Sequence, residues 1–350
     1  MVKCAQDPTD MQVFWSDVQM GHDGARFLKA GRLTPSPETP RRADLILGAL
    51  SGAAFEVVTP DDLGLDPLLR VHPGVYLEFL RGIAGRWADQ FGADAAVLPN
   101  VLAGGALAHV PTGLVGALGY YVNDLAAEIR GGTWAASYAS AQCAANAARL
   151  VAIAGAPAYA LCRPPGHHAG ASAAMGFCYL NNAAISAEEL RRVHPRVAIV
   201  DIDVHHGNGT QSIFYDRGDV LTASMHSDPS EYYPWHSGYE DECGTGEGAG
   251  CNVNVCFAGD VDDAGFARAF DRLAVSVAAF RPDAIVVALG MDALRSDPHG
   301  GHRITPDGYV ALARRIRDWG LPTVIVQEGG YESDELGPTV ARFLTALKHG

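Results

Sequence analysis

The sequence predicts a single α/β domain, with a central, mostly parallel sheet and helices on both faces. Through the second half of the 350-residue chain, short apolar runs alternate with longer helical segments. Strands joined by helices of this length form crossover connections in a parallel sheet. Hydrophobic residues make up 48% of the chain and charged residues 19%, as expected of a globular protein with a sizeable core. With no internal repeat and no composition break, residues 1–350 are expected to form one domain.

The expected strands are short, rich in β-branched residues and bounded by Gly, Pro or charged residues, which favours buried strands. They span 158–162, 197–202, 220–224, 284–289 and 323–326. The helices expected around them span 133–153, 182–193, 264–280, 306–319 and 335–348. Nearer the N-terminus, helices with Pro in the first turn are expected at 40–50 and 73–85. The segment 91–121 is rich in Gly, Ala and Leu without a clear period, and it is expected to be a long loop.

Composition excludes several functional classes. The formal net charge of −14 opposes nucleic-acid binding; it suits a cationic substrate, although solubility alone explains it. No apolar run approaches the roughly 20 residues that span a bilayer. The seven cysteines contain no CxxC pair, so we expect reduced thiols rather than disulfides or a cysteine zinc site. Without a basic stretch followed by an apolar run at the N-terminus, a cytoplasmic protein is expected.

Reactive side chains gather directly after four of the expected strands. In open α/β sheets, ligands bind in the crevice at the carboxyl ends of the strands, so four such clusters predict one shared site. The clusters contain His167 and His168 after the first strand, Asp201, Asp203, His205 and Asn208 after the second, Asp292 after the fourth and Tyr331 after the fifth.

The spacing of the acidic residues predicts a metal site. Side chains alternate along a strand, so Asp201, Asp203 and His205 point to the same side, and Asp292 can approach from another strand. Two carboxylates and one imidazole suit zinc or ferrous iron with a position left open for water. A single Asp at a strand end could equally be a helix N-cap or a loop hydrogen-bond acceptor, but several buried acids there are costly without a metal or paired charge.

Two adjacent histidines beside such a site suit proton exchange near neutral pH. Asp201 is expected to orient one ring and Asn208 the other. The hydroxyl of Tyr331 follows two glycines and is able to donate to a developing oxyanion. Taken alone, either a histidine in the core or a tyrosine packed at a loop would be the simpler interpretation.

Five motifs in this order resemble the zinc-dependent histone deacetylase superfamily: RPPGHHA (163–169), GFCYLNNAA (176–184), VDIDVHHGNGT (200–210), ALGMDA (288–293) and EGGY (328–331). Within it, the chain is most similar to the bacterial acetylpolyamine amidohydrolases, through PRRADLIL (40–47), LGYY (118–121), GTW (132–134) and FYDRGDVLTASMHSDP (214–229). The resemblance implies an arginase-like α/β fold.

The resemblance also implies roles for individual residues. Zinc would be bound by Asp203, His205 and Asp292. His168 would be the general base and then the general acid, His167 paired with Asp201 would act electrostatically, and Tyr331 would polarise the substrate carbonyl. Asn208, where others have Asp, follows class II-like members. The resemblance further implies a structural potassium ion near Asp201, Asp203, His205, Ser224 and Met225. It also implies that the substrate-binding residues include Gly176, Phe177, Tyr233 and Gly329.

The expected function is therefore hydrolysis of a small N-acyl amine, such as an acetylpolyamine, acetyl-lysine or a related amide. Two departures bear on the substrate: Ala126 stands where the acetylpolyamine subfamily has an acidic residue that recognises the polyamine, and residues 173–175 lack the aromatic residue or second glycine expected there. Segment 91–121 falls where that subfamily has an insertion used in dimerisation, which implies a homodimer. The alternatives are a catalytically silent acyl-amine-binding protein on the same fold and a manganese ureohydrolase.

Overall fold

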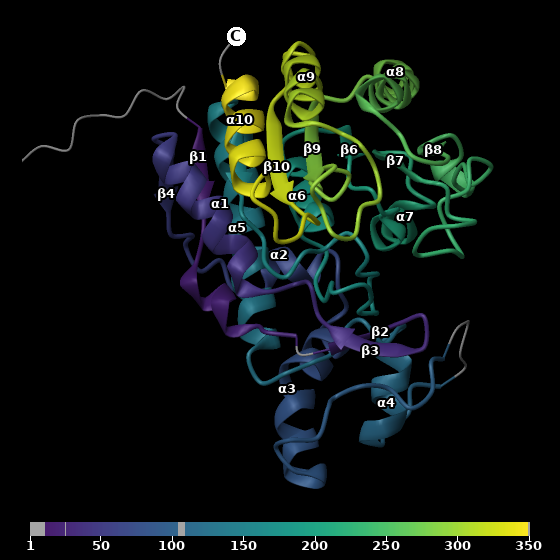
Figure 1. Ribbon diagram of the computed structural model, residues 1–350. Coiled ribbons are helices and arrows are strands. Elements are labelled where there is room, and N and C mark those ends of the chain that lie inside the picture. Colours follow the sequence, from purple (N-terminus) through teal and green to yellow (C-terminus); the bar gives the residue numbers. More distant parts are fainter. Residues whose placement is uncertain (1–10, 25, 104–108, 349–350) are drawn as a thin grey trace, which may run out of the picture.

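An eight-stranded parallel sheet forms the centre of the molecule (Figure 1). The structure is a computed structural model, and it describes residues 11–24, 26–103 and 109–348. The strand order is β4-β1-β5-β10-β9-β6-β7-β8. In chain order the strands are β1 (Gln12–Phe14), β4 (Glu56–Val58), β5 (Ala158–Ala160), β6 (Val197–Asp201), β7 (Val220–Ser227), β8 (Asn252–Phe257), β9 (Ala284–Leu289) and β10 (Thr323–Gln327).

Helices cover both faces of this sheet, which confirms the predicted fold class. On one face lie α1 (Pro40–Gly52), α8 (Asp263–Phe280), α9 (Pro306–Arg317) and α10 (Leu336–Lys348); on the other lie α5 (Thr133–Ala154) and α6 (Asn182–Arg191). Successive strand residues feed the two cores in turn, as a period of two requires. In β6, Ala198 and Val200 pack with the first helix group and Val197 and Ile199 with the second.

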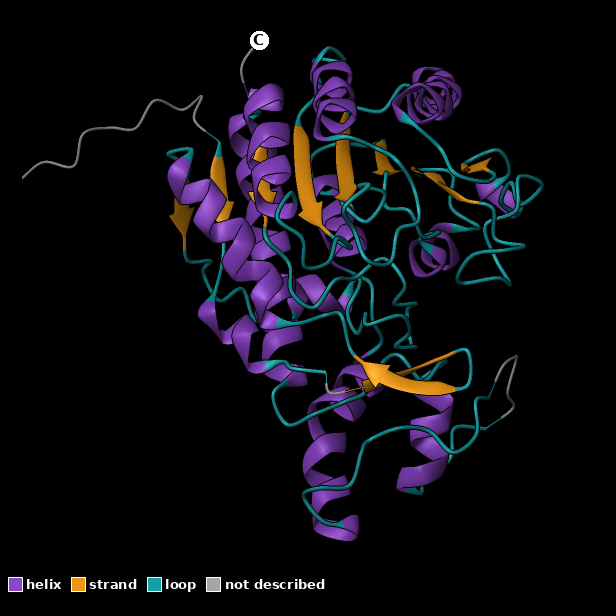
Figure 2. Cartoon of the chain, in the orientation of Figure 1, coloured by secondary structure: helices purple, strands orange, loops and turns teal. Residues whose placement is uncertain are grey.

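The remaining elements lie mainly beyond the carboxyl ends of the strands. They are the antiparallel hairpin of β2 (Arg26–Lys29) and β3 (Arg32–Pro35), and the helices α2 (Asp66–Leu69), α3 (Gly74–Phe91), α4 (Leu114–Tyr121) and α7 (Asn208–Phe214). Two 3₁₀ helices span Asp17–Gly21 and Gly246–Gly248. In Figure 2 the arrowheads of the central strands point toward the side on which this hairpin lies.

The structure corrects the expectation of a continuous loop over 91–121. Residues 114–121 form helix α4, whose buried Leu118 and Tyr121 lie in the same core as α3. The glycines of this segment lower its helix propensity, so the sequence did not predict a helix there. The helix forms because it packs against the core. Helix α3 also runs beyond its predicted end at 85, because Ile83 and Trp87 continue its buried face, and it ends before Gly92 with a φ of 95°. Residues 104–108 lie outside the described residues.

The unpredicted strands are short or irregular in hydrophobicity. Strands β1 and β4 have three residues each, too few for a period to show. In β8, two asparagines alternate with apolar residues, and both are buried. Their burial is tolerated because the side-chain amides of Asn252 and Asn254 donate to Gln211 Oε1 at 2.8 and 2.9 Å. No helix among the described residues is long and apolar enough to cross a membrane. The six cysteines in the described segments are all free.

Candidate active site

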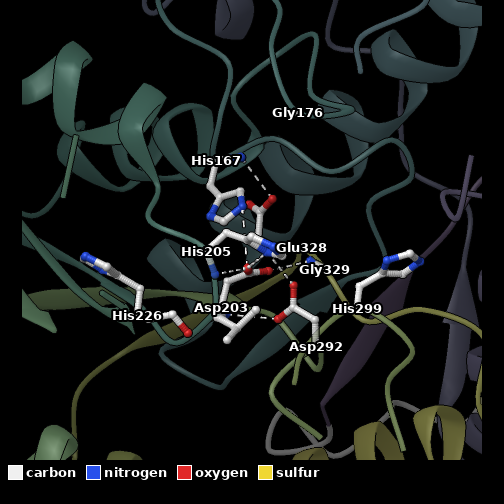
Figure 3. Close-up of polar contacts among 12 residues, drawn as sticks. His167, Gly176, Asp203, His205, His226, Asp292, His299, Glu328 and Gly329 are labelled. Atoms are coloured by element: carbon white, nitrogen blue, oxygen red, sulfur yellow. Dashed lines mark hydrogen bonds and ion pairs between the residues drawn. The ribbon is translucent and has the colours of Figure 1, made fainter. Parts of the chain in front are cut away.

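Three ligand-type side chains converge at the carboxyl ends of β6 and β9. Asp203 and His205 follow β6, and Asp292 follows β9, the neighbouring strand. The Nδ1 atom of His205 lies 3.2 Å from Asp203 Oδ1 and 2.9 Å from Asp292 Oδ2. The three ligand atoms lie within 4.8 Å of one another, and Figure 3 shows the imidazole directed at both carboxylates.

The charge of this group calls for a cation. Both carboxylates are fully buried, and buried anions are costly unless they are paired or bind a metal. Burial and the charge of Asp203 raise the pKa of Asp292 to about 6. Burial lowers the pKa of His205, but its bonds to Asp203 and Asp292 outweigh this and raise it to about 9. Two carboxylates and one imidazole are ligands typical of zinc.

The surrounding backbone is shaped closely around these carboxylates. The amide nitrogen of Gly329 donates to Asp203 Oδ2 at 2.8 Å, and that of Val204 donates to Asp292 Oδ1 at 3.0 Å. A Cβ atom at Gly329 would lie 2.3 Å from Asp292 Oδ2 and 2.6 Å from Asp203 Oδ2. Only glycine therefore lets the loop after β10 approach the ligand group so closely.

The adjacent histidines lie in the loop after β5, and their ring centroids are 4.0 Å apart. The Nδ1 atom of His167 lies 2.9 Å from Asp201 Oδ2, and that of His168 lies 2.7 Å from Asn208 Oδ1. The two rings differ in charge. Burial lowers the pKa of His167, but the charges of Asp203 and Asp201 outweigh it and raise that pKa well above its ordinary value.

In contrast, burial and the neighbouring charge of His167 lower the pKa of His168 well below its ordinary value. A charged carboxylate beside one ring and a neutral amide beside the other explain the difference. The pair therefore holds one positive charge on the inner ring, His167, and offers a neutral imidazole, His168, toward the cavity that it lines.

Tyr331 lies in the loop after β10, and several contacts hold it in place. Its amide nitrogen donates to Asp297 Oδ2 at 2.7 Å. The guanidinium of Arg42, from α1, lies 5.0 Å from the Tyr331 ring centroid and donates to the carbonyl oxygens of Gly330 and Glu328 at 2.5 and 2.6 Å. Burial raises the pKa of Tyr331 well above its ordinary value, so its hydroxyl keeps the proton.

A cavity of about 520 Å³ opens above this group. Of the predicted site residues, His168, His205 and Tyr331 line it together with Gly176, Phe177 and Tyr233. A Cβ atom at Gly176, whose φ is 54°, would lie 2.5 Å from His168 Cδ2 and 2.8 Å from the Tyr233 hydroxyl. Glycine at this position therefore keeps the passage beside His168 open.

Ser224 and Met225 lie outside this cavity, within β7. Ser224 is the register partner of Asp201, and both line a separate small cavity of about 10 Å³ together with His206, Asn252 and Asn254. The Ser224 hydroxyl lies 2.8 Å from His226 Nδ1. The Met225 side chain is buried in the core.

Sequence reasoning gave no role to several residues that shape the site. Glu328 Oε2 accepts from the amide nitrogens of Gly166 at 2.6 Å and His167 at 3.0 Å, which joins the loops after β5 and β10. Asp124 Oδ2 accepts from the Tyr233 hydroxyl at 2.7 Å and the Gly176 amide at 3.0 Å. The one feature of the sequence that could have indicated a role for Glu328 is its position directly before two glycines. Asp124 flanks Ala126, whose own side chain only lines the cavity.

Comparison with known proteins agrees with these motifs. The model of the histone deacetylase domain matches residues 36–347. The chain belongs to the histone deacetylase family. It is 43% identical to acetylpolyamine amidohydrolase 1 of Pseudomonas aeruginosa over 92% of this chain and 94% of that one, and 39% identical to acetylpolyamine amidohydrolase of Mycoplana ramosa over 96% and 99%.

A solved structure is similar over nearly the whole chain. The acetylpolyamine aminohydrolase from Burkholderia pseudomallei superimposes with a TM-score of 0.91 at 40% identity, covering 97% of this chain and 98% of that one. The cluster of ligand-type and proton-exchanging residues thus lies on a scaffold shared by this group of family members.

Proposed function

We propose that the chain is a zinc-dependent amidohydrolase that cleaves the amide of a small N-acyl amine, such as an acetylpolyamine or an acetyl-lysine. The observation that carries the proposal is a buried Asp203–His205–Asp292 group beside a cavity that His168 and Tyr331 also line. The names of the similar amidohydrolases point to the same reaction class.

Asp203, His205 and Asp292 would hold the zinc ion. When bound, zinc supplies a Lewis acid that polarises a carbonyl and lowers the pKa of water to about 7, so that a nucleophile is available at neutral pH. The fit rests on the buried double negative charge and on Gly329, where a side chain would collide with both carboxylates.

His168 is suited to move a proton. Its Nδ1 atom faces the Asn208 carbonyl oxygen, an acceptor, so Nδ1 carries the hydrogen and Nε2 is left to take a proton from the attacking water. His168 then returns that proton to the leaving amine nitrogen. His167 is held beside Asp201 and keeps a positive charge. That charge favours the neutral form of His168 before the reaction. It also favours the ionised form of the nearby carboxylates.

Tyr331 is suited to bind the substrate carbonyl oxygen. Its raised pKa keeps a hydroxyl hydrogen available for donation, and the bond strengthens as negative charge develops on that oxygen. Phe177 and Tyr233 would wall the acyl group and the first methylenes, since both line the cavity and the Phe177 and Tyr331 ring centroids lie 6.3 Å apart. Gly176 and Gly329 complete this proposed substrate-binding set.

A structural potassium ion is a further part of the proposal. It would lie near Asp201, Asp203, His205, Ser224 and Met225, partly on backbone oxygens. The pairing of Asp201 with Ser224 and the small polar cavity that both line support it. Potassium content after exhaustive dialysis into sodium buffer tests the idea, and a chain with none bound and unchanged stability would contradict it.

We also propose a cytoplasmic homodimer in which segment 91–121 contributes to the interface. The support is a group of exposed apolar side chains in and near that segment: Phe91, Val101, Leu102, Val110 and Val115. Exposed apolar side chains mark a contact surface where they are contiguous, and an interface would bury them. Light scattering at micromolar concentration should give twice the mass of the chain, and a monomer would contradict the dimer.

Hydrolysis of a panel of acetylated amines tests the function. Acetate release from acetylputrescine, acetylspermidine, an acetyl-lysine peptide and a simple anilide should identify at least one substrate of the zinc-loaded protein. Tight binding without acetate release from any of them would instead favour a silent acyl-amine-binding protein. A manganese ureohydrolase needs a second metal, and the described residues offer one ligand group of this kind.

A further inference from the structure

A lysine from outside the family domain faces the same cavity. The β2–β3 hairpin supplies Phe27, Leu28, Lys29 and Ala30 to the cavity lining, and these residues precede the segment 36–347 that matches the histone deacetylase domain. The Lys29 ammonium lies 3.5 Å from His299 Nδ1, and the His299 ring centroid lies 5.0 Å from that of Tyr331. Lys29 is therefore one side chain removed from the proposed reaction centre.

The charge of Lys29 is available to a ligand. It is the one lysine or arginine among the described residues that line the cavity, and no carboxylate in the described segments lies within ion-pair distance of it. Burial and the charge of Lys29 lower the pKa of its neighbour His299 to about 4, so that ring is neutral at pH 7. Figure 3 places His299 beside the ligand group, on the Asp292 side.

The two carboxylates of the cavity lining, Asp124 and Glu231, are poorly suited to bind the ammonium end of a substrate. Asp124 is fully engaged, because Oδ2 accepts from Tyr233 and Gly176 and Oδ1 accepts from the amide nitrogens of Ala126 and Ala127 at 3.0 and 3.1 Å. Glu231 lines the cavity but is exposed, so water screens its charge. Lys29 is exposed as well, but its ammonium lies 3.5 Å from His299 Nδ1, and the His299 ring in turn neighbours Tyr331.

We propose that Lys29 is a specificity-determining residue, which favours N-acyl amines whose far end carries a carboxylate over those that end in an ammonium group. The inference rests on the proposed amidohydrolase function. The ω-acylamino acids, which end in a carboxylate alone, belong to the favoured class. The apolar stretch between amide and carboxylate would pass Phe177 and Phe27, whose ring centroids are 5.5 Å apart.

Three amides of matched length isolate the effect of charge: 6-acetamidohexanoate, N-acetylcadaverine and N-pentylacetamide. The first two differ only in ending with a carboxylate or an ammonium, and the third is neutral. The zinc-loaded wild type should have a higher kcat/KM for 6-acetamidohexanoate than for N-acetylcadaverine. Because a charge pair at an exposed site contributes up to about 1 kcal/mol, Lys29→Met should lower this ratio by up to about fivefold, and Lys29→Glu should lower it further and favour N-acetylcadaverine.

Arg32→Met is the matched control, since Arg32 is the register partner of Lys29 on the same hairpin but does not line the cavity. It should leave the ratio unchanged within about twofold. The change in Lys29→Met should lie in KM, because the charged end remains distant from the reacting bond. An unchanged ratio in Lys29→Met, or an equal change in Arg32→Met, would overturn the proposal.

Hydrolysis of N-pentylacetamide separates the two hypotheses. If Lys29→Met hydrolyses it at the wild-type rate, the catalytic machinery is intact and a lost preference for carboxylate belongs to Lys29. If the wild type hydrolyses neither these three amides nor any member of the acetylated-amine panel, the proposed function fails. Calorimetric Kd values for the same amides and variants then decide the role of Lys29 independently: the same change in the binding ratio would support it, and equal ratios would reject it.

Discussion

At the scale of single residues, the i, i+2 spacing correctly predicted that Asp203 and His205 lie next to each other. The expected strand ends sooner than that argument assumed, because β6 stops at Asp201 and both residues lie in the loop that follows it. The partners of the two histidines were likewise expected from residue type. Glu328 and Asp124 could not be assigned in this way. Their partners are backbone amides and a hydroxyl on segments that come close only after folding, such as Gly166 for Glu328 and Tyr233 for Asp124.

Replacing Tyr331 with Phe should lower turnover about 100- to 1,000-fold, the usual effect of losing one donor to a developing oxyanion. The Tyr331 ring contacts, including those with His299 and Phe177, should survive, so metal content and unfolding temperature should stay near wild type. Acetate release and metal analysis on the same preparation measure both effects. Wild-type turnover in the variant would remove Tyr331 from the mechanism.

At the scale of elements, the active-site loop after β10 depends on helix α1. Arg42 is buried, donates to two carbonyl oxygens of that loop and pairs with the buried Glu38 at 2.9 Å. The sequence predicted α1 through Pro40 but not this contact, because a helix pattern identifies the buried face and not what it meets. An arginine on the buried face was the only available signal.

Arg42→Met should destabilise the protein by about 3 kcal/mol, because it leaves Glu38 with one fewer partner and two buried carbonyl oxygens without donors. It should also lower turnover through displacement of Tyr331. Arg41→Met is the matched control: Arg41 is the preceding residue of the same helix and is exposed, so its loss should change stability by less than about 0.5 kcal/mol. Urea denaturation of both variants measures the difference, and equal stabilities would refute the anchoring role.

At the scale of the whole molecule, the buried strands β6, β7, β9 and β10 were predictable, because each is an apolar run in a part of the chain where strands and strongly patterned helices alternate. The N-terminal part was predicted less well. There the three-residue strands and the hairpin β2–β3 are defined by long-range pairing, and α4 is defined by packing against α3. The hairpin matters most for function, since it brings Lys29 to the cavity.

The central claim is that zinc at Asp203, His205 and Asp292 is required for amide hydrolysis. The most direct measurement is acetate release by protein stripped with a chelator and then titrated with zinc, alongside an Asp292→Asn variant. We predict negligible activity without metal, full recovery at one zinc per chain, and at least tenfold weaker zinc binding in Asp292→Asn. Full activity in the stripped protein, or equal zinc affinity in the variant, would contradict the account.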